Sequence, residues 1–488
     1  MLGVLVLATL TVVPAPRSVV LTGGTCSLSN LEAHVRLVKD ATVPAEGYRL
    51  EVAADGVTVT SADDAGAFYA LKTLGQLGPS NVPCLKVEDS PAFGWRGFML
   101  DEGRRFFGKE VVKRCLDRMA DYKLNVFHWH LTEDQGWRLA IDRFPELVKY
   151  GSVRPESVAY GSTGVAGRDK PEKMKTNGEQ YGPFFYTAAD VKEILAYAAA
   201  RHIRVVPEIE VPGHARALLA AHPEFSCAGT HQRHPAIFHG VQDAVLCAGN
   251  DAAIAFYEQV FDAVCEMFPD AYVHIGGDEC PKKAWKTCPK CQARIKSLGL
   301  KDEDALQAWV TRHFTDYLAK KGRRAIGWDE VFAGDPGKDT VIQGWHIRHG
   351  NKFGLRAAEA GYPTIVSDLM RTYFSVAQGV EDDPFTYLSP GMRVTLAEAY
   401  AFDPFDGMTA KARPNVIGAE CCMWSECTWN LYDLEWKLFP RFCAFAEAVW
   451  TAPAMPRDFA DFERRMAVHR KRLIKSGVNC APLFSADR

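Results

Sequence analysis

The order of hydrophobic and polar residues divides the chain into two parts of unequal length. In the first part, Tyr48–Val52 and Val57–Thr60 alternate apolar and polar residues, the pattern of half-buried strands. Asp55-Gly56 between them is a turn signal that predicts a hairpin. Ala65–Leu77 then repeats apolar residues at helical spacing. These patterns predict a small α+β domain over residues 1–90.

From residue 91 to residue 488, short apolar runs alternate with longer amphipathic stretches. Eight strands, each leading into a helix or a long loop, match a (β/α)8 TIM barrel in number and spacing. The predicted strands are Gly97–Leu100, Val126–His130, Val205–Ile209, Tyr272–Ile275, Ala325–Trp328, Val341–Trp345, Thr364–Ser367 and Val416–Cys421. The predicted helices are Val111–Tyr122, Ala188–Arg201, Ile254–Met267, Ala305–Lys320 and Leu434–Val449.

Composition is that of a folded protein, with 47% hydrophobic and 24% charged residues. The net charge is -3 with both signs interspersed, so no basic stripe points to nucleic acid. The apolar segment Leu2–Val13 is too short to span a bilayer, and no transmembrane segment is predicted. It is either the core of a signal peptide or, as Leu10–Val20, the first strand of the fold. A periplasmic or secreted location is slightly favoured over the cytoplasm, and the absence of Asn-x-Ser/Thr fits a bacterial protein.

The sharpest chemical signal is the run His274-Ile-Gly-Gly-Asp-Glu279. Two glycines at a strand end allow close approach to a ligand, and two adjacent acids follow. In a dry pocket one acid can keep its proton while its neighbour stays ionised, as glycoside cleavage requires. A lone Asp-Glu is more often a helix cap beside a solvated acid, so the surrounding residues decide.

Reactive residues follow every predicted barrel strand. Barrel enzymes build their sites from the loops at the carboxyl ends of the strands, so these residues can converge on one mouth. In chain order they are Arg104, Glu133, His214, Asp278 with Glu279, Trp328, Trp345, Tyr373, and Trp424 with Glu426.

Six blocks of sequence resemble the family 20 glycoside hydrolases, in family order, over roughly residues 15–450. They are Arg96–Gly108, Leu124–Arg138, Pro207–His214, His274–Glu279, Gly327–Glu330 and Trp424–Glu426. The resemblance implies retaining hydrolysis in which the 2-acetamido group of the sugar is the nucleophile. It implies that Glu279 is the general acid and base, that Asp278 orients the acetamide, and that Tyr373 donates to its oxygen. The resemblance further assigns an apolar box around the acetamide to Trp328, Trp345 and Trp424.

The same resemblance assigns the outer sugar hydroxyls to Arg104, with Glu426 as its partner, and a supporting pair to His214 and Glu133. Glu210 is expected to hold His214. For Arg104, the alternative to sugar binding is a structural ion pair with Asp101. For His214, the alternative is a structural histidine whose hydrogen bonds are satisfied in the core. Glu133 stands where many relatives have Asp, and Ser375 stands where they often have an acid. The second departure leaves the preference between GlcNAc and GalNAc open.

A separate group of cysteines follows the catalytic pair. Cys288-Pro-Lys-Cys291 resembles half of a zinc knuckle, and Cys280 is available as a third ligand, which predicts a structural zinc. The sequence does not identify a fourth ligand, and free thiols or a disulfide are the alternatives. Cys227 and Cys247 could pair if the protein is exported. Catalysis itself is expected to require no cofactor.

Other functions stay open at this stage. A metal-dependent barrel hydrolase would use His128, His130, His214 and Asp278 as ligands. A sugar-binding barrel without catalysis and a lacto-N-biosidase that releases a disaccharide are further alternatives. The favoured function is an exo-β-N-acetylhexosaminidase acting on terminal GlcNAc or GalNAc of glycans or chitooligosaccharides, as a monomer or a homodimer.

Overall fold

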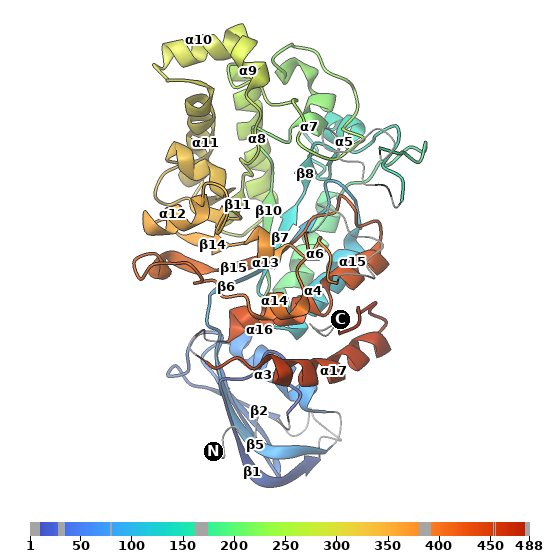
Figure 1. The fold of residues 1–488 in the computed structure, drawn as a ribbon, viewed down its shortest axis with the longest axis vertical. Helices are drawn as coiled ribbons and strands as arrows, with labels where there is room; N and C mark the ends of the chain where they lie inside the picture. The colour runs from blue at the N-terminus through green and yellow to red at the C-terminus, as the bar shows by residue number, and fades with distance from the viewer. Residues whose placement is uncertain are drawn as a thin grey trace.

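The computed structural model describes residues 10–27, 35–78, 81–160, 162, 174–379, 392–451, 453 and 455–483. A small domain built on one sheet lies at one end of the molecule, and a closed barrel lies next to it along the long axis (Figure 1). Most of the predicted segment 2–13 lies outside the described residues. Within the described part, no helix is both long and apolar enough to cross a membrane.

The N-terminal domain is a five-stranded sheet in the order β1-β5-β3-β4-β2, covered by helix α3. β3 and β4 pair antiparallel from Tyr48 opposite Ser61 to Ala53 opposite Gly56, which confirms the predicted hairpin. The expected strand over Leu10–Val20 is wrong in its start, since β1 begins at Ser18. The elements are β1 (Ser18–Ser27), β2 (Val35–Lys39), β3 (Tyr48–Ala53), β4 (Gly56–Ser61), α3 (Asp64–Leu77) and β5 (Asn81–Asp89).

All eight predicted barrel strands are present, and they close into a parallel barrel. Their residues are almost all buried, because barrel strands face the interior on one side and helices on the other. The TIM-barrel prediction is therefore confirmed. The strands are β6 (Trp95–Asp101), β7 (Val126–His130), β10 (Arg204–Glu208), β11 (Tyr272–His274), β12 (Arg324–Trp328), β13 (Val341–Gly344), β14 (Thr364–Val366) and β15 (Val416–Met423).

Four of the five predicted barrel helices form as single helices, α4 (Lys109–Asp121), α6 (Ala188–Ala199), α8 (Asp251–Met267) and α11 (Glu303–Lys320). The fifth prediction, Leu434–Val449, is wrong as one helix. Pro440 has no N–H for a helical hydrogen bond, and the segment divides there into α15 (Leu431–Leu438) and α16 (Arg441–Trp450).

Further elements complete the barrel domain and carry its loops. They are β8 (Thr132–Glu133), β9 (Gly136–Trp137), α5 (Glu146–Gly151), α7 (Arg216–Ala221), α9 (Lys283–Thr287), α10 (Pro289–Ser297), α12 (Phe353–Glu359), α13 (Leu369–Thr372), α14 (Leu396–Tyr400) and α17 (Phe459–Lys475), with 3-10 turns at Pro223–Phe225, Asp329–Gly334 and Arg413–Asn415.

The two domains share a buried polar junction centred on Asp89, the last residue of β5. Its carboxylate accepts hydrogen bonds from Trp450 Nε1 at 3.0 Å and Tyr48 OH at 2.7 Å. Lys123 Nζ lies 3.1 Å away, and neither side chain of that ion pair is exposed. Helix α17 lies beside α3 (Figure 1), and its His469 Nε2 is 2.6 Å from the carbonyl of Thr11. The barrel domain is thus joined to the N-terminal part of the chain both at Asp89 and through helix α17.

Candidate active site

The strand β11 leads into a sharply turned loop that carries the two adjacent acids. Gly276, Gly277 and Glu279 all have positive φ, at 64°, 94° and 42°. A Cβ on Gly276 would lie 1.7 Å from a carboxylate oxygen of Glu210, so only glycine fits there. The left-handed conformation of Glu279 is uncommon for a residue with a side chain and is typical of functional sites.

His214 connects this loop to the loop after β7. Its Nδ1 lies 2.7 Å from Glu133 Oε1, and its Nε2 lies 3.5 Å from Asp278 Oδ2 and 3.8 Å from Glu279 Oε2. Burial alone would lower the pKa of His214, but Glu133 and Asp278 outweigh it and hold the pKa well above its usual range. The imidazole of His214 therefore lies between one buried carboxylate and the two adjacent acids Asp278 and Glu279, which favour its charged form.

The acid Glu279 has the electrostatics of a proton donor. Burial raises its pKa, His214 acts in the opposite direction, and the negative charge of Asp278 raises it again, with a net upward shift. Its side chain is 41% exposed, whereas that of Asp278 is 13% exposed. Glu279 is therefore the more accessible of the two acids, and Asp278 is the more buried.

Arg104 forms a second centre, surrounded by three carboxylates. Its guanidinium lies 3.1 Å from Asp101, 3.1 Å from Glu133 and 3.7 Å from Glu426. Both the predicted partner Glu426 and the alternative partner Asp101 are therefore present. The guanidinium also lies 5.0 Å from the centre of the Trp424 ring, which joins this centre to the aromatic residues.

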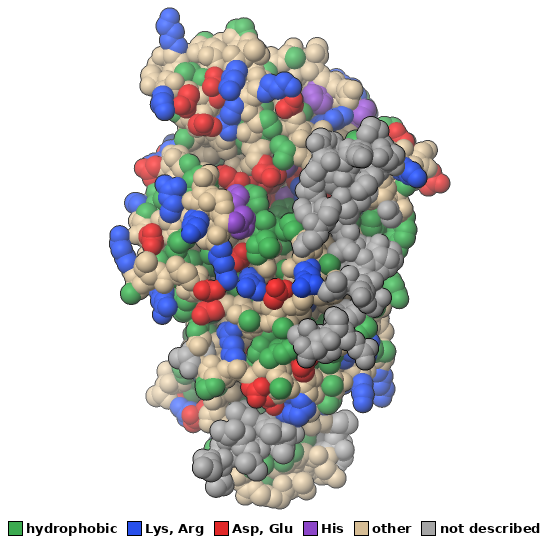
Figure 2. Space-filling view, in the orientation of Figure 1, with side chains coloured by type: hydrophobic (Ala, Val, Ile, Leu, Met, Phe, Trp, Pro, Cys, Tyr) green, Lys and Arg blue, Asp and Glu red, His purple; other side chains and the backbone are tan. Residues whose placement is uncertain are grey.

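Four aromatic residues pack as one cluster beside these charges. Trp328 and Trp424 have ring centres 5.6 Å apart, and Tyr373 lies 5.9 Å from Trp424. Trp345 packs against the same cluster and donates from Nε1 to Glu330 at 2.9 Å. All ten residues predicted for the site are thus linked by contacts. Figure 2 shows acidic side chains beside hydrophobic ones near the middle of this face, over the barrel.

A buried polar layer centred on Glu208 holds the aromatic cluster in place. Glu208, at the end of β10, accepts from Trp328 Nε1 at 2.8 Å and lies 2.6–2.9 Å from nitrogens of three histidines, namely His128, His130 and His274. Burial alone would raise the pKa of Glu208, but these histidines hold it well below its usual range. Sequence reasoning did not assign this hub, although it lies inside the block Pro207–His214.

Among the ligands of the metal-hydrolase alternative, His128 lies between two carboxylates. Its Nδ1 lies 2.7 Å from Glu420 and its Nε2 lies 2.9 Å from Glu208. With both ring nitrogens engaged by carboxylates, His128 serves as a structural cation, and the pKa of this imidazole is raised to about 9 because Glu420 and Glu208 outweigh the effect of burial.

The expected role of Glu210 is wrong. Its two carboxylate oxygens have no hydrogen-bond partner among the described residues. His214 is instead held by Glu133 and by Asp134, whose Oδ2 is 3.2 Å from Nδ1. Asp134 was missed because the sequence shows two adjacent acids without showing that both turn toward the same histidine.

The predicted metal ligands need one correction. Cys288 and Cys291 do lie together, but the cysteines that join them in a group of four are Cys227 and Cys247, and Cys280 is not a member of that group. The thiol of Cys280 faces the carbonyl of Pro281 at 4.0 Å. Cys280 follows the left-handed Glu279 and is turned toward the loop after β10, where Gly213 packs on its backbone.

A closed parallel barrel with paired acids, a cationic histidine and an aromatic box at one mouth is the arrangement of a glycoside hydrolase. The family model "Glycosyl hydrolase family 20, catalytic domain" matches residues 93–453, and "Glycosyl hydrolase family 20, domain 2" matches residues 27–90. The chain belongs to glycosyl hydrolase family 20, as the sequence motifs predicted.

Named relatives and solved structures agree with this assignment. A β-hexosaminidase of Porphyromonas gingivalis is 38% identical over 89% of this chain, which spans only 54% of that relative's length. A β-hexosaminidase of Akkermansia muciniphila is 32% identical over 90% of this chain and 87% of its own. The crystal structure of a β-N-acetylhexosaminidase superposes with a TM-score of 0.85 at 30% identity, over 96% of both chains. A mutant Streptomyces plicatus β-hexosaminidase in complex with its product GlcNAc superposes with a TM-score of 0.80 at 30% identity, over 96% of this chain and 95% of its own.

Proposed function

We propose that this chain is an exo-β-N-acetylhexosaminidase that removes terminal β-linked GlcNAc or GalNAc with retention of configuration. The nucleophile is the acetamide oxygen of the substrate, and Glu279 is the general acid and base. The observation that carries the proposal is the state of Asp278. Its Oδ1 is buried and has no hydrogen-bond partner within the described part of the chain.

A buried carboxylate oxygen without a partner is costly unless a ligand supplies a donor. The N–H of a 2-acetamido group is such a donor, and the neighbouring aromatic cluster suits its methyl group. Tyr373 belongs to this cluster. Burial raises the pKa of its phenol well above the usual range, with Cys422 and Asp278 adding to the effect, so Tyr373 keeps its proton and can donate to the acetamide oxygen.

In the first step, Glu279 gives its proton to the glycosidic oxygen while the acetamide oxygen attacks the anomeric carbon. The bond to the leaving group breaks, and an oxazolinium ion forms with its positive charge beside Asp278. In the second step, Glu279 takes a proton from water, which attacks the anomeric carbon and reopens the ring. Two inversions give net retention, and no step requires a cofactor.

The enclosing residues act by position. Trp328, Trp345 and Trp424 hold the acetamide close to the anomeric carbon and exclude water, which makes an intramolecular attack efficient. Arg104 with Glu426 provides a charged fork for the outer hydroxyls of a terminal sugar. Relatives whose structures contain GlcNAc, from Vibrio harveyi and Streptomyces plicatus, support GlcNAc as the first sugar to test.

The decisive experiment compares a chromogenic β-GlcNAc substrate with the matching β-glucoside, using the wild type, Glu279→Gln and Asp278→Asn. We expect wild-type turnover of β-GlcNAc, losses of about 10²–10⁴-fold in Glu279→Gln, and almost no turnover of the glucoside. Equal turnover of the glucoside would contradict participation of the acetamide.

Two further substrates separate the alternatives. Release of a disaccharide, with no activity on a single terminal GlcNAc, would indicate a lacto-N-biosidase. Binding of GlcNAc without hydrolysis of any hexosaminide would indicate a sugar-binding barrel. The ratio of kcat/KM for GlcNAc and GalNAc substrates measures the preference that Ser375 leaves open, since its buried hydroxyl has no partner among the described residues.

A further inference from the structure

Four cysteine thiols from two separate loops meet beside the barrel mouth. Cys227 and Cys247 come from the segment between α7 and α8, and Cys288 and Cys291 come from the junction of α9 and α10. Their sulfur atoms all lie within 4.8 Å of one another. Three of the four side chains are buried, and Cys227 is half-buried.

The distances between the sulfurs fit a tetrahedron around one metal ion. Sγ of Cys247 lies 3.7 Å from Sγ of both Cys288 and Cys291, and Sγ of Cys227 lies 3.9 Å from that of Cys291. A tetrahedral Zn²⁺ with Zn–S bonds of about 2.3 Å requires its sulfurs to be about 3.8 Å apart. A disulfide would require about 2.05 Å, and none of these three pairs approaches it.

The surrounding backbone favours thiolates at this position. Cys288 is the N-cap residue of α10 and Cys291 lies in its first turn, where the helix dipole stabilises negative charge. The N–H of Gly249 is directed at the thiols of Cys247 and Cys291. Gly249 lacks a side chain for a clear reason, because a Cβ would lie 2.2–2.3 Å from the backbone of Lys290 and Cys291.

We propose that Cys227, Cys247, Cys288 and Cys291 bind one structural Zn²⁺. The ion displaces the thiol protons to solvent and undergoes no redox change. Its four protein ligands leave no open position for substrate or water, so the site is structural and lies apart from the catalytic acids.

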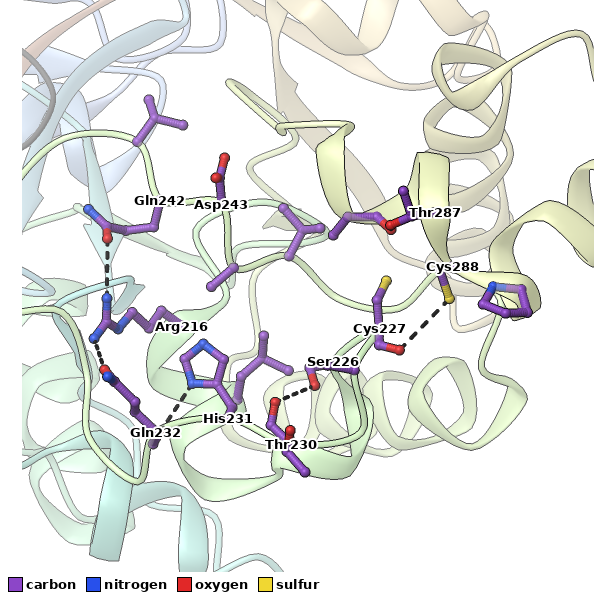
Figure 3. Close-up of a pocket in the computed structure, with 17 residues that line it drawn as sticks. Arg216, Ser226, Cys227, Thr230, His231, Gln232, Gln242, Asp243, Thr287 and Cys288 are labelled. Carbon is purple, nitrogen blue, oxygen red and sulfur yellow. Dashed lines mark hydrogen bonds between the residues drawn. The ribbon is translucent and has the colours of Figure 1, made fainter.

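The metal would join two segments that form the wall of a cavity of about 880 Å³. Cys227 and Cys288 lie in this wall together with Arg216, Thr230 and Asp243 (Figure 3). The same two segments are linked to the loops that carry His214 and Glu279. Leu246 N donates to the carbonyl of Pro212 at 3.0 Å, and Gly213 packs against the backbone of Asp278.

Helix α9 is hydrogen-bonded to the segment between α7 and α8, because Trp285 Nε1 donates to the carbonyl of Leu246 at 2.8 Å. The zinc would therefore fix the relative position of the His214 loop and the Glu279 loop without touching the substrate.

The test is metal analysis of the full chain, purified without chelators or a metal-affinity tag. We expect about one zinc per chain in the wild type and a loss of at least tenfold in Cys247→Ser and in Cys291→Ser. Cys280→Ser and Cys265→Ser are the matched controls, which should retain the metal because neither thiol belongs to the cluster.

A spectroscopic readout covers the case in which the serine variants fail to fold. After removal of the metal from the wild type with a mercurial and a chelator, addition of Co²⁺ should give the thiolate-to-cobalt charge-transfer absorption of a tetrahedral all-sulfur site. Wild type without zinc, wild type with iron instead, disulfides among the four cysteines, or zinc retained in Cys247→Ser would each overturn the proposal.

Discussion

His214 Nδ1 lies 2.7 Å from a carboxylate oxygen of Glu133, and the other oxygen of the same carboxylate lies 3.1 Å from Arg104. One buried acid thus holds both the cation beside the catalytic pair and the cation assigned to the outer sugar hydroxyls. The two halves of the site depend on a single side chain.

Glu133→Gln should therefore impair both halves. Because Arg104 and His214 each lose a charged partner in a buried setting, we expect kcat/KM on a β-GlcNAc substrate to fall about 10²-fold through misplacement. Steady-state kinetics measures the change. Glu133→Asp is the matched control, which keeps the charge with a shorter reach and should lose less. A Gln variant within twofold of the wild type would show that Glu133 has no positioning role.

The pH profile of kcat/KM should report the proton on Glu279. Its raised pKa keeps the acid protonated at higher pH than an ordinary glutamate, and activity falls as pH rises through that pKa. His214→Asn removes a cation that lowers this pKa, so the alkaline limb should move to higher pH. Asp278→Asn removes an anion that raises it, so the limb should move to lower pH. Shifts in the same direction in both variants would contradict the assignment.

Glu208→Gln should destabilise the barrel. Burial alone would lower the pKa of both histidines, but Glu420 with Glu208 raises that of His128 to about 9, and Glu208 with Glu133 raises that of His130 to about 10. Loss of a buried ionic partner costs about 3–5 kcal/mol, measured by chemical denaturation at pH 7. Glu51→Gln, in an exposed pair with Lys86, should cost less than about 1 kcal/mol.

The same pair of histidines gives a pH dependence of stability. A folded-state pKa above the unfolded value of about 6.5 contributes stability that is present below pH 6.5 and is lost as pH rises through about 9 and 10. The wild type should lose stability over this window. In Glu208→Gln the free energy of unfolding should fall less steeply as pH rises. An unchanged slope would show that Glu208 is not the origin of this pH dependence.

Gly276→Ala should abolish activity by displacing Glu210 and the loop that carries the catalytic pair. A Cβ there would lie 1.7 Å from the Glu210 carboxylate, and the residue has φ 64°. Gly322→Ala separates the contact with Glu210 from backbone strain, since Gly322 has φ 72° but no described atom lies within 4 Å of its Cβ position. The control should show only the backbone strain, about 1–2 kcal/mol of unfolding free energy, with activity retained. Equal losses in both variants would exclude the contact with Glu210 as the cause.

The barrel was predictable because its strands carry short apolar runs at regular intervals, each ended by a reactive residue such as Glu133 or Trp328. Motif order also predicts Asp278 and Glu279 as the catalytic pair, which stays a prediction. What the sequence could not show is which side chains from distant loops face one another. Asp134 replaces Glu210 as the second partner of His214, because the loop after β7 turns back over that histidine.

The cysteines also show that the sequence does not tell which side chains from distant segments meet. The spacing of Cys288 and Cys291 indicated a metal site, and adjacency in sequence suggested Cys280 as the next ligand. The structure places Cys227 and Cys247 there instead, because the segment before α8 folds against α10. The break at Pro440, by contrast, was readable from the sequence, since a proline inside a helical pattern predicts an interruption.

The contact between α17 and the start of the described chain has a consequence for synthesis. Thr11 and His469 are separated by 458 positions, and Val12 receives a hydrogen bond from Arg465 at 3.0 Å. A ribosome adds about 5–20 residues per second, so the segment around Thr11 waits roughly 20–90 seconds for its partner helix. During that time Val12 and Val13, both buried in the finished fold, are not yet covered by α17. A chaperone that binds apolar segments can bind them in this interval.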